Sequence, residues 1–220
     1  MSKRVESVLY GVIAAASLAG TWTYNVKLFL AGGGLGDFLR QAYANNPVAS
    51  LSTDLFLAAL LLMFWMAREG RRQGIKHTWA YVLFSATVAI SAVFPLFLLA
   101  RRRAIDARGE TGGASSLTAA YPLFSGVSFI LVNLSVVRFA QEHLPWSLFV
   151  ESWFATPGAG TLAVDLLGLS ATLLVWLIAE ARRGRVRRVA LYIALCFLGV
   201  AFALPWFLRE LDVNPVGSGA

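Results

Sequence analysis

Long apolar runs dominate this chain and set the strongest limit on its fold. Six segments approach the ~20 residues that an α-helix needs to cross ~30 Å of hydrocarbon. They cover residues 8–30, 52–68, 78–100, 119–140, 161–180 and 187–208. The runs are too long for strands and show no sustained alternation of apolar and polar residues. The sequence therefore predicts an all-α integral membrane protein with six transmembrane helices.

The charge of the chain fits a membrane better than a nucleic acid. Only 14% of the residues are charged, whereas a soluble domain carries about 25%. The net charge of +7 would suggest nucleic-acid binding in a soluble protein. Here the basic residues cluster at the ends of apolar runs, for example Arg71-Arg72 and Arg182-Arg183, where they orient helices and meet anionic head groups. We expect membrane lipids as partners, and no nucleic acid.

The composition also suggests where the protein resides. Most basic residues are Arg, and Ala, Gly and Val are abundant, which indicates a bacterial chain of the cytoplasmic (inner) membrane, crossing it several times. The start Met-Ser-Lys-Arg resembles the basic flank of a signal peptide, but no convincing cleavage site follows before Leu30, so we expect a retained helix. Cys196 is the single cysteine, which excludes an internal disulfide.

The chain contains an internal repeat. A shift of 111 positions superimposes matching residues in the same order, and with one residue deleted Pro95 also matches Pro205. The matching pairs include Asp54 with Asp165, Trp65 with Trp176, Glu69 with Glu180, and Arg71-Arg72 with Arg182-Arg183. Chance does not produce such an ordered set, so we infer a duplication.

The duplication predicts the domain organisation. We expect a first three-helix repeat at 1–103, a linker at 104–116, a second three-helix repeat at 117–210 and a flexible tail at 211–220, with 217–220 as a possible remnant of cloning. Three spans are an odd number, so the second repeat is expected to be inverted relative to the first. This arrangement spreads the basic residues almost evenly over both sides, so it does not predict the orientation.

Two stretches between the apolar runs predict short helices. Residues 32–47 separate the first and second spans, and residues 144–160 separate the fourth and fifth. Both stretches mix aromatic and polar side chains and are too short and too polar to span. We therefore expect interfacial or re-entrant helices there.

The repeated residues also carry a family resemblance. Phe38, Asp54, the run Glu69-Gly70-Arg71-Arg72 and the run Pro95-Leu96-Phe97-Leu98 resemble a family of small bacterial three-helix membrane proteins, the domain of unknown function 2834. The first copy fits best over residues 35–102. The second, over 146–209, is similar but diverged, with alanine at 181 and 190 where the pattern has glycine and tryptophan. The resemblance implies the fold and a membrane location, and it implies no activity.

Asp54 and Asp165 are the most suggestive acids. Each is expected within the first turns of an apolar helix, where a charge is costly and usually has a role. One interpretation is a proton, cation or head-group site at the interface between the repeats. The other is an acid stabilised by the dipole of its own helix, with Ser52 and Thr53 as caps beside Asp54. The sequence leaves both open.

Carboxylates and arginines are expected together at the ends of the second and fifth helices. A helix C-terminus favours cations, and a nearby carboxylate can pair with them. Anchoring at the interface is the simplest interpretation, and capture of a lipid head group or phosphate is the alternative. The whole candidate polar, ion or head-group site comprises Asp54, Asp165, Glu69, Glu180, Arg71, Arg72, Arg182 and Arg183.

Other polar and aromatic residues receive structural interpretations. Trp65 and Trp176 are expected in an aromatic belt at the membrane interface, and Asn25 and Asn133 in hydrogen bonds between helices. His77 and His143, like the rest of the chain, show no metal-ligand spacing. No nucleophile or nucleotide motif is present either, so we expect no catalytic residue, metal or cofactor.

These observations favour a non-catalytic membrane protein. We expect an accessory subunit that packs against other integral membrane proteins in a larger inner-membrane assembly that handles lipids. One alternative is a small transporter with a site between Asp54 and Asp165. The other is a membrane-embedded enzyme acting on a lipid or isoprenoid, with one of these acids, Glu69 or Glu180 as proton donor.

Overall fold

The computed structural model describes residues 2–109 and 119–214, and within them the chain is helical and contains no strand. This confirms the expected all-α class. Of the predicted linker and tail, residues 110–116 and 215–220 lie outside the described residues, whereas residues 104–108 and 211–213 continue the helices before them. The first repeat forms α1 (Lys3–Leu30), α2 (Leu35–Ala42), α3 (Asn46–Arg72), α4 (Thr78–Thr87) and α5 (Ile90–Arg108). The second forms α6 (Tyr121–Gln141), α7 (Ser147–Glu151), the 3-10 helix η2 (Ser152–Phe154), α8 (Pro157–Arg182), α9 (Val189–Cys196) and α10 (Val200–Val213).

Four helices are long and apolar enough to cross a membrane. They are α1, α3, α6 and α8, with 28, 27, 21 and 26 residues. Local sequence features mark the ends of these helices. Asn45, for example, accepts a hydrogen bond from the Val48 N–H and caps the N-terminus of α3. These helices show that the chain has the character of a membrane protein.

The third apolar run of the first repeat is not a continuous helix. It is broken between Thr87 and Ile90, and its two halves fold back on each other. The start of α4 lies at the end of α3, where a Cβ atom on Gly70 would collide with the Thr78 side chain. The ring centroids of Tyr81 on α4 and Phe97 on α5 are 5.6 Å apart. Residues 78–108 therefore form a helical hairpin.

The second repeat contains the equivalent hairpin. The Arg187 N–H before α9 donates to Glu210 near the end of α10 at 2.9 Å, and the rings of Tyr192 and Phe207 lie 6.0 Å apart. At the tip, Gly199 has a φ of +140°, which an L side chain rarely adopts. The prediction of continuous helices at 78–100 and 187–208 is therefore wrong.

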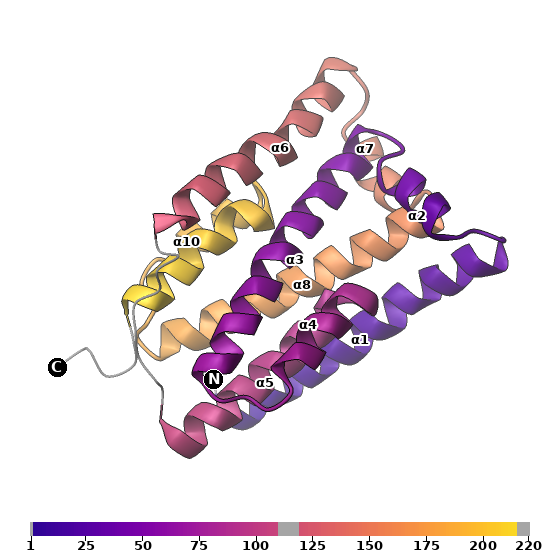
Figure 1. The fold of residues 1–220 in the computed structure, drawn as a ribbon. Helices are drawn as coiled ribbons and strands as arrows, with labels where there is room; N and C mark the ends of the chain where they lie inside the picture. The colour runs from indigo at the N-terminus through magenta and orange to yellow at the C-terminus, as the bar shows by residue number, and fades with distance from the viewer. Residues whose placement is uncertain (1, 110–118, 215–220) are drawn as a thin grey trace.

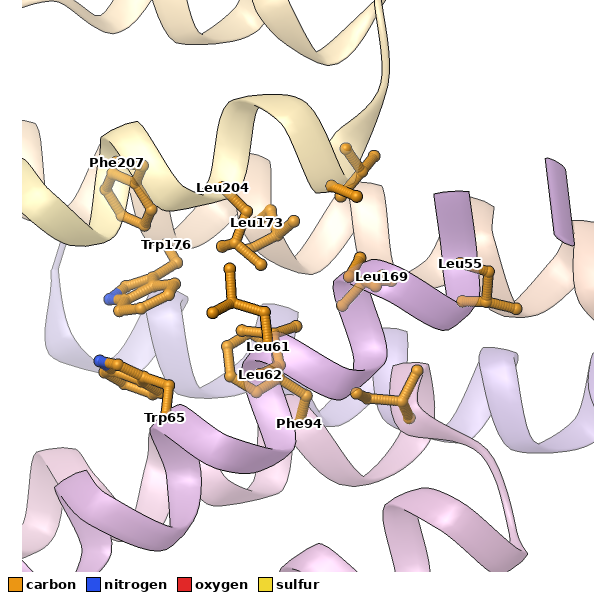
Figure 2. Close-up of a cluster of buried hydrophobic side chains, with 14 of the residues drawn as sticks. Leu55, Leu61, Leu62, Trp65, Phe94, Leu169, Leu173, Trp176, Leu204 and Phe207 are labelled. Atoms are coloured by element: carbon orange, nitrogen blue, oxygen red, sulfur yellow. The ribbon is translucent and has the colours of Figure 1, made fainter. Parts of the chain in front are cut away.

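The two repeats run in the same direction. The rings of Trp65 on α3 and Trp176 on α8 are 5.0 Å apart, so the two helices lie side by side at equivalent positions (Figure 2). In Figure 1, α3, α5, α8 and α10 all end at the lower left, where α1 begins. The third apolar run of the first repeat is a hairpin, so the chain returns to the end of the molecule at which this run began. The second repeat therefore starts at the same end as the first, and its expected inversion is wrong.

The first helix of each repeat packs against its own repeat, on α5 or α10, and also against the other repeat. Helix α1 packs along α8 of the other repeat, and α6 packs along α3. The core between them contains side chains from both repeats, including Leu62, Phe94, Leu169 and Leu204 (Figure 2). Trp65 and Trp176 belong to this core, with 3% and 1% of their surface exposed. Their expected place in an interfacial belt is therefore wrong.

Short helices occupy both stretches between the apolar runs, as expected. Helix α2 follows α1, and α7 with η2 follows α6. The Gly34 N–H donates to Asp37 at the start of α2, and this bond, together with Arg40, holds the pKa of the Asp37 carboxyl below its usual range. These helices lie at the end of the molecule where α3 and α8 begin (Figure 1).

Candidate functional site

Asp54 holds the tip of the hairpin in the opposite repeat. Its two carboxylate oxygens accept the backbone N–H groups of Val200 and Ala201 at 2.8 and 2.7 Å. These are among the first N–H groups of α10, which have no partner within their own helix. Asp54 therefore caps α10, and the expected capping of its own helix is wrong, since α3 begins at Asn46.

Asp165 makes the reciprocal contact. One of its oxygens accepts the backbone N–H of Ser91 at 2.9 Å and also the Ser91 hydroxyl, at the start of α5. Each repeat thus supplies a carboxylate that accepts backbone N–H groups at the start of the second hairpin helix in the other repeat. The two acids lie at the interface between the repeats, but each binds the hairpin tip of the opposite repeat, and no contact joins the two acids in the described chain.

Glu69 and Glu180 meet in one buried cluster. Each has only 1% of its surface exposed, and Arg101 of α5 lies between them. The Arg101 Nε is 2.7 Å from Glu69, and its Nη1 is 3.5 Å from Glu180. The guanidinium also lies over the ring of Trp65 at 5.9 Å. Because an unpaired buried charge is costly, each carboxylate needs a cation, and Arg101 is the cation that bridges the two.

Further arginines complete this charge cluster. Arg72 and Arg183 pair with the glutamates of their own helices at 2.8 and 2.9 Å, which agrees with the expected local pairing. Arg183 also reaches Glu6 of α1 at 2.6 Å. Arg185 lies 3.1 Å from Glu180. The cluster therefore ties α1, α3, α5 and α8 together at one end of the molecule.

The remaining two candidate arginines have a different position. Arg71 and Arg182 are exposed, at the same end of the molecule as the cluster. Their side chains therefore face the surroundings of the protein, so anchoring at the membrane interface stays a prediction. The eight candidate residues thus separate into hairpin caps, a buried charge cluster and an exposed basic pair.

An apolar cavity of about 710 Å³ lies between α3 of the first repeat and the helices of the second repeat. Side chains of α3, α6, α7, η2, α8, α9 and α10 line it, and most of them are aliphatic or aromatic. Several lining residues are also exposed at the surface, among them Leu167, Leu174 and Phe197. The cavity therefore opens sideways from the helix bundle. Of the eight candidate residues, only Asp54 lines it.

A second hollow is polar and lies elsewhere. It has a volume of about 560 Å³, between the start of α3 and the end of α6. Arg138 and Glu142 line it, and Glu142 accepts a hydrogen bond from the Asn46 side chain. Asp165 lines neither of these two cavities.

Several important residues were not recognised from the sequence. Arg101 and Arg185 lack an arginine at the matching position of the other repeat, where Leu211 and Gly74 stand, so the repeat gave no signal for them. Trp153, which lines the cavity, matches Ala42. The hydrogen bonds expected for the two asparagines are confirmed: Asn25 accepts from Thr161, and Asn133 donates to the Leu198 carbonyl.

Comparisons with known proteins give one match. The chain matches the family model described as protein of unknown function DUF2834 over residues 9–103 and again over residues 120–210. The two matches cover most of the chain and coincide with the two structural repeats. Neither a curated protein nor a solved structure matches it.

Proposed function

The chain belongs to the family described as protein of unknown function DUF2834, as two tandem copies, and on this premise we propose how it lies in a membrane and what it holds there. Helices α1, α3, α6 and α8 cross the bilayer, while α4–α5 and α9–α10 are re-entrant hairpins. Helix α4 has 10 residues and α9 has 8, which gives about 15 and 12 Å, half or less of the hydrocarbon thickness. Residues 1–103 and 117–210 form the repeats, and residues 104–116 join them.

The distribution of charge supports this arrangement and gives it an orientation. The chain has 19 Lys and Arg residues. Lys27, Arg40 and Arg138 lie at the end where α1 and α6 finish, and all the others lie at the end that holds Glu69 and Glu180. Such asymmetry is typical of the positive-inside rule. We place the basic end in the cytoplasm and the protein in the bacterial inner membrane.

The function that the geometry supports best is the binding of a lipid chain by a non-catalytic membrane subunit. The apolar cavity carries this proposal, since its lining is almost entirely apolar and it opens toward the bilayer. Its volume of about 710 Å³ falls in the range of ~300–1,000 Å³ that ligand sites occupy. An empty apolar cavity forfeits dispersion contacts, so a lipid chain is its natural occupant.

The two rival functions receive less support from the geometry. A transporter would require a shared site, whereas Asp54 and Asp165 each bind the tip of a different hairpin. Acid catalysis in the cavity would require Asp54 to carry a proton. Both of its oxygens already accept backbone N–H groups at the start of α10, so the carboxyl group is held by the hairpin tip. Asp54 therefore fits a structural role at the cavity wall.

Enlarging residues in the cavity wall tests the proposed function. The first repeat offers the replacements, because Leu60 and Val93 match Ala171 and Ala203 of the lining. We expect the double variant Ala171→Leu, Ala203→Val to lose most of the lipid that the wild-type chain retains through mild-detergent purification, as measured by native mass spectrometry. Ala194→Leu, at an exposed position of α9 outside the lining, is the matched control and should retain the lipid. A wild-type chain that carries no lipid would contradict the proposal.

We also propose that this subunit belongs to a larger assembly of membrane proteins. Supporting this, α1 and α6 are apolar helices with long exposed faces, and small residues such as Gly11 and Gly126 leave open space beside them. Purification from the native membrane in mild detergent should recover a partner in fixed ratio. Recovery of the free chain alone, after cross-linking in intact membranes, would count against an assembly.

A further inference from the structure

The polar hollow between the start of α3 and the end of α6 contains hydrogen-bond donors that the protein leaves unused. The lining side chains whose donors have no partner in the described part of the chain are those of Tyr43, Asn45, Thr53, Ser135 and Arg138. The Thr53 and Ser135 hydroxyls keep accessible surface, and the other three side chains are exposed, so a ligand in the hollow can reach them. The hollow is therefore rich in donors for an oxygen-bearing anion.

One carboxylate belongs to the same hollow. Glu142 follows the last residue of α6, and one of its oxygens accepts a hydrogen bond from the Asn46 side chain. Its other oxygen has no partner among the described residues, and no ion pair joins it to Arg138. The hollow thus offers one positive and one negative group to a ligand. A ligand that carries both charges would match them, whereas a purely anionic ligand would meet repulsion from Glu142.

The hollow lies close to one edge of the hydrocarbon in the proposed membrane arrangement. Thr53 is about 10 Å inside the start of α3 at Asn46, by the rise of an α-helix. Arg138 is about 5 Å from the end of α6 at Gln141 by the same measure. Lipid head groups occupy this zone of a bilayer. The phosphate of a lipid can therefore meet the unused donors there.

Apolar surface leads from the hollow toward the middle of the bilayer. On each helix, large apolar side chains lie at helical spacings from Thr53 or Arg138, which places them on the same face. These side chains, all exposed, are Phe56, Leu60 and Phe64 on α3, and Val127, Leu131 and Leu134 on α6. The two faces can carry acyl chains whose head group lies in the hollow, and a soluble anion would leave them uncovered.

From these observations we propose that the hollow binds the head group of a phospholipid that bears an ammonium group. The phosphate lies against Arg138 and the Thr53 and Ser135 hydroxyls, because a guanidinium forms strong, charge-assisted hydrogen bonds with phosphate oxygens. The ammonium lies against the unpaired oxygen of Glu142. This site is separate from the apolar cavity, and it rests on the proposed function only for the membrane crossing of α3 and α6.

Lipid titration of the full-length chain tests the proposal. The chain in mild detergent is titrated with phosphatidylethanolamine or with phosphatidylglycerol that has the same acyl chains, and the bound lipids are counted by native mass spectrometry. The wild type should bind phosphatidylethanolamine more tightly, and excess inorganic phosphate should not displace it. The double variant Ala171→Leu, Ala203→Val, in which the apolar cavity is filled, should show the same preference.

Two positions separate the roles of the charges. Arg138→Gln should weaken the binding of both lipids about three- to tenfold, since it removes a charge-assisted contact at an accessible site. Arg138→Lys keeps the charge and should restore most of the affinity. Glu142→Gln keeps an acceptor for Asn46 and removes the negative charge, so the preference for phosphatidylethanolamine should disappear.

The equivalent junction of α1 with α8 provides the matched control. There Ala31 matches Glu142, so no carboxylate accompanies the cation. That cation, Lys27, matches Arg138 and lies over the ring of Tyr24 at 5.0 Å. Lys27→Gln should leave the affinities for both lipids unchanged.

Three results would overturn the inference or the proposed function separately. Unchanged binding by Arg138→Gln, or displacement of the lipid by inorganic phosphate, would exclude a lipid head group from the hollow. A wild type that prefers phosphatidylglycerol, or a preference for phosphatidylethanolamine that survives in Glu142→Gln, would show that the ammonium is wrongly assigned. Binding in the hollow together with an apolar cavity that takes up no lipid would contradict the proposed function alone.

Discussion

At the scale of single residues, Arg101 has the largest structural role. It lies between two buried carboxylates that belong to different repeats, and it also contacts the ring of Trp65. Taking charges out of water costs several kcal/mol per ion, and good geometry recovers this cost only when every charge has a partner. The charge cluster is thus stable as a set and sensitive to the loss of its central cation.

Replacing Arg101 by alanine tests this role. Removal of one partner from a buried ion pair costs about 3–5 kcal/mol when the other charge is left unpaired. Glu69 keeps Arg72, and Glu180 keeps Arg183 and Arg185. We therefore expect Arg101→Ala to lower the free energy of unfolding by about 1–3 kcal/mol, measured by thermal unfolding in detergent. Arg103→Ala, an exposed neighbour on the same helix, should change it by less than about 0.5 kcal/mol. Equal effects of the two substitutions would refute the central role of Arg101.

The sequence predicted part of this cluster and missed the rest for a physical reason. The pairs Glu69–Arg72 and Glu180–Arg183 are local, three residues apart on a helix, so helical spacing alone suggests them. The contacts of Arg101 join residues that are distant along the chain. Only the folding back of α5 brings them together, and no periodicity in the sequence encodes that.

At the scale of elements, the hairpins are the feature that hydropathy could not reveal. An apolar run of spanning length is equally compatible with one long helix and with two short helices that fold back. The break in the first repeat, between Thr87 and Ile90, contains neither glycine nor proline. What stabilises it is Asp165, a carboxylate from the other repeat. The repeat itself, the long helices and the short helices α2 and α7 were predictable because their signals are local.

Substitutions of Asp54 test whether the acid holds the hairpin. Hydrogen bonds to a charged group contribute about 1.5–3 kcal/mol, so Asp54→Ala should destabilise the protein by at least that amount. Asp54→Asn keeps one acceptor oxygen and should have a smaller effect. Protease cleavage near the hairpin tip, at Phe197–Gly199, should be faster in Asp54→Asn than in the wild type, and fastest in Asp54→Ala. The exposed Glu151→Gln serves as the control, and no difference between it and Asp54→Ala would exclude the capping role.

At the scale of the whole molecule, two parallel repeats explain features that an inverted arrangement leaves unexplained. Both halves place most of their arginines at one end, and the buried cluster joins the halves there. Both halves contribute a carboxylate that holds the other's hairpin. The second repeat differs in having smaller side chains, such as Ala171 and Ala203, in the lining of the apolar cavity. Duplication thus accounts for the common frame, and the smaller side chains of the second repeat line the cavity that we propose as a lipid site.

The side of the membrane on which residues 107 and 141 lie tests this account most directly. Single cysteines are introduced as Ala107→Cys and Gln141→Cys in a Cys196→Ser background and labelled in sealed vesicles with an impermeant maleimide. Lys76→Cys and Gly36→Cys mark the two sides. Re-entrant hairpins place residue 107 on the side of residue 76, and residue 141 on the side of residue 36. Six spanning helices would place each of them on the opposite side, and that result would contradict the account.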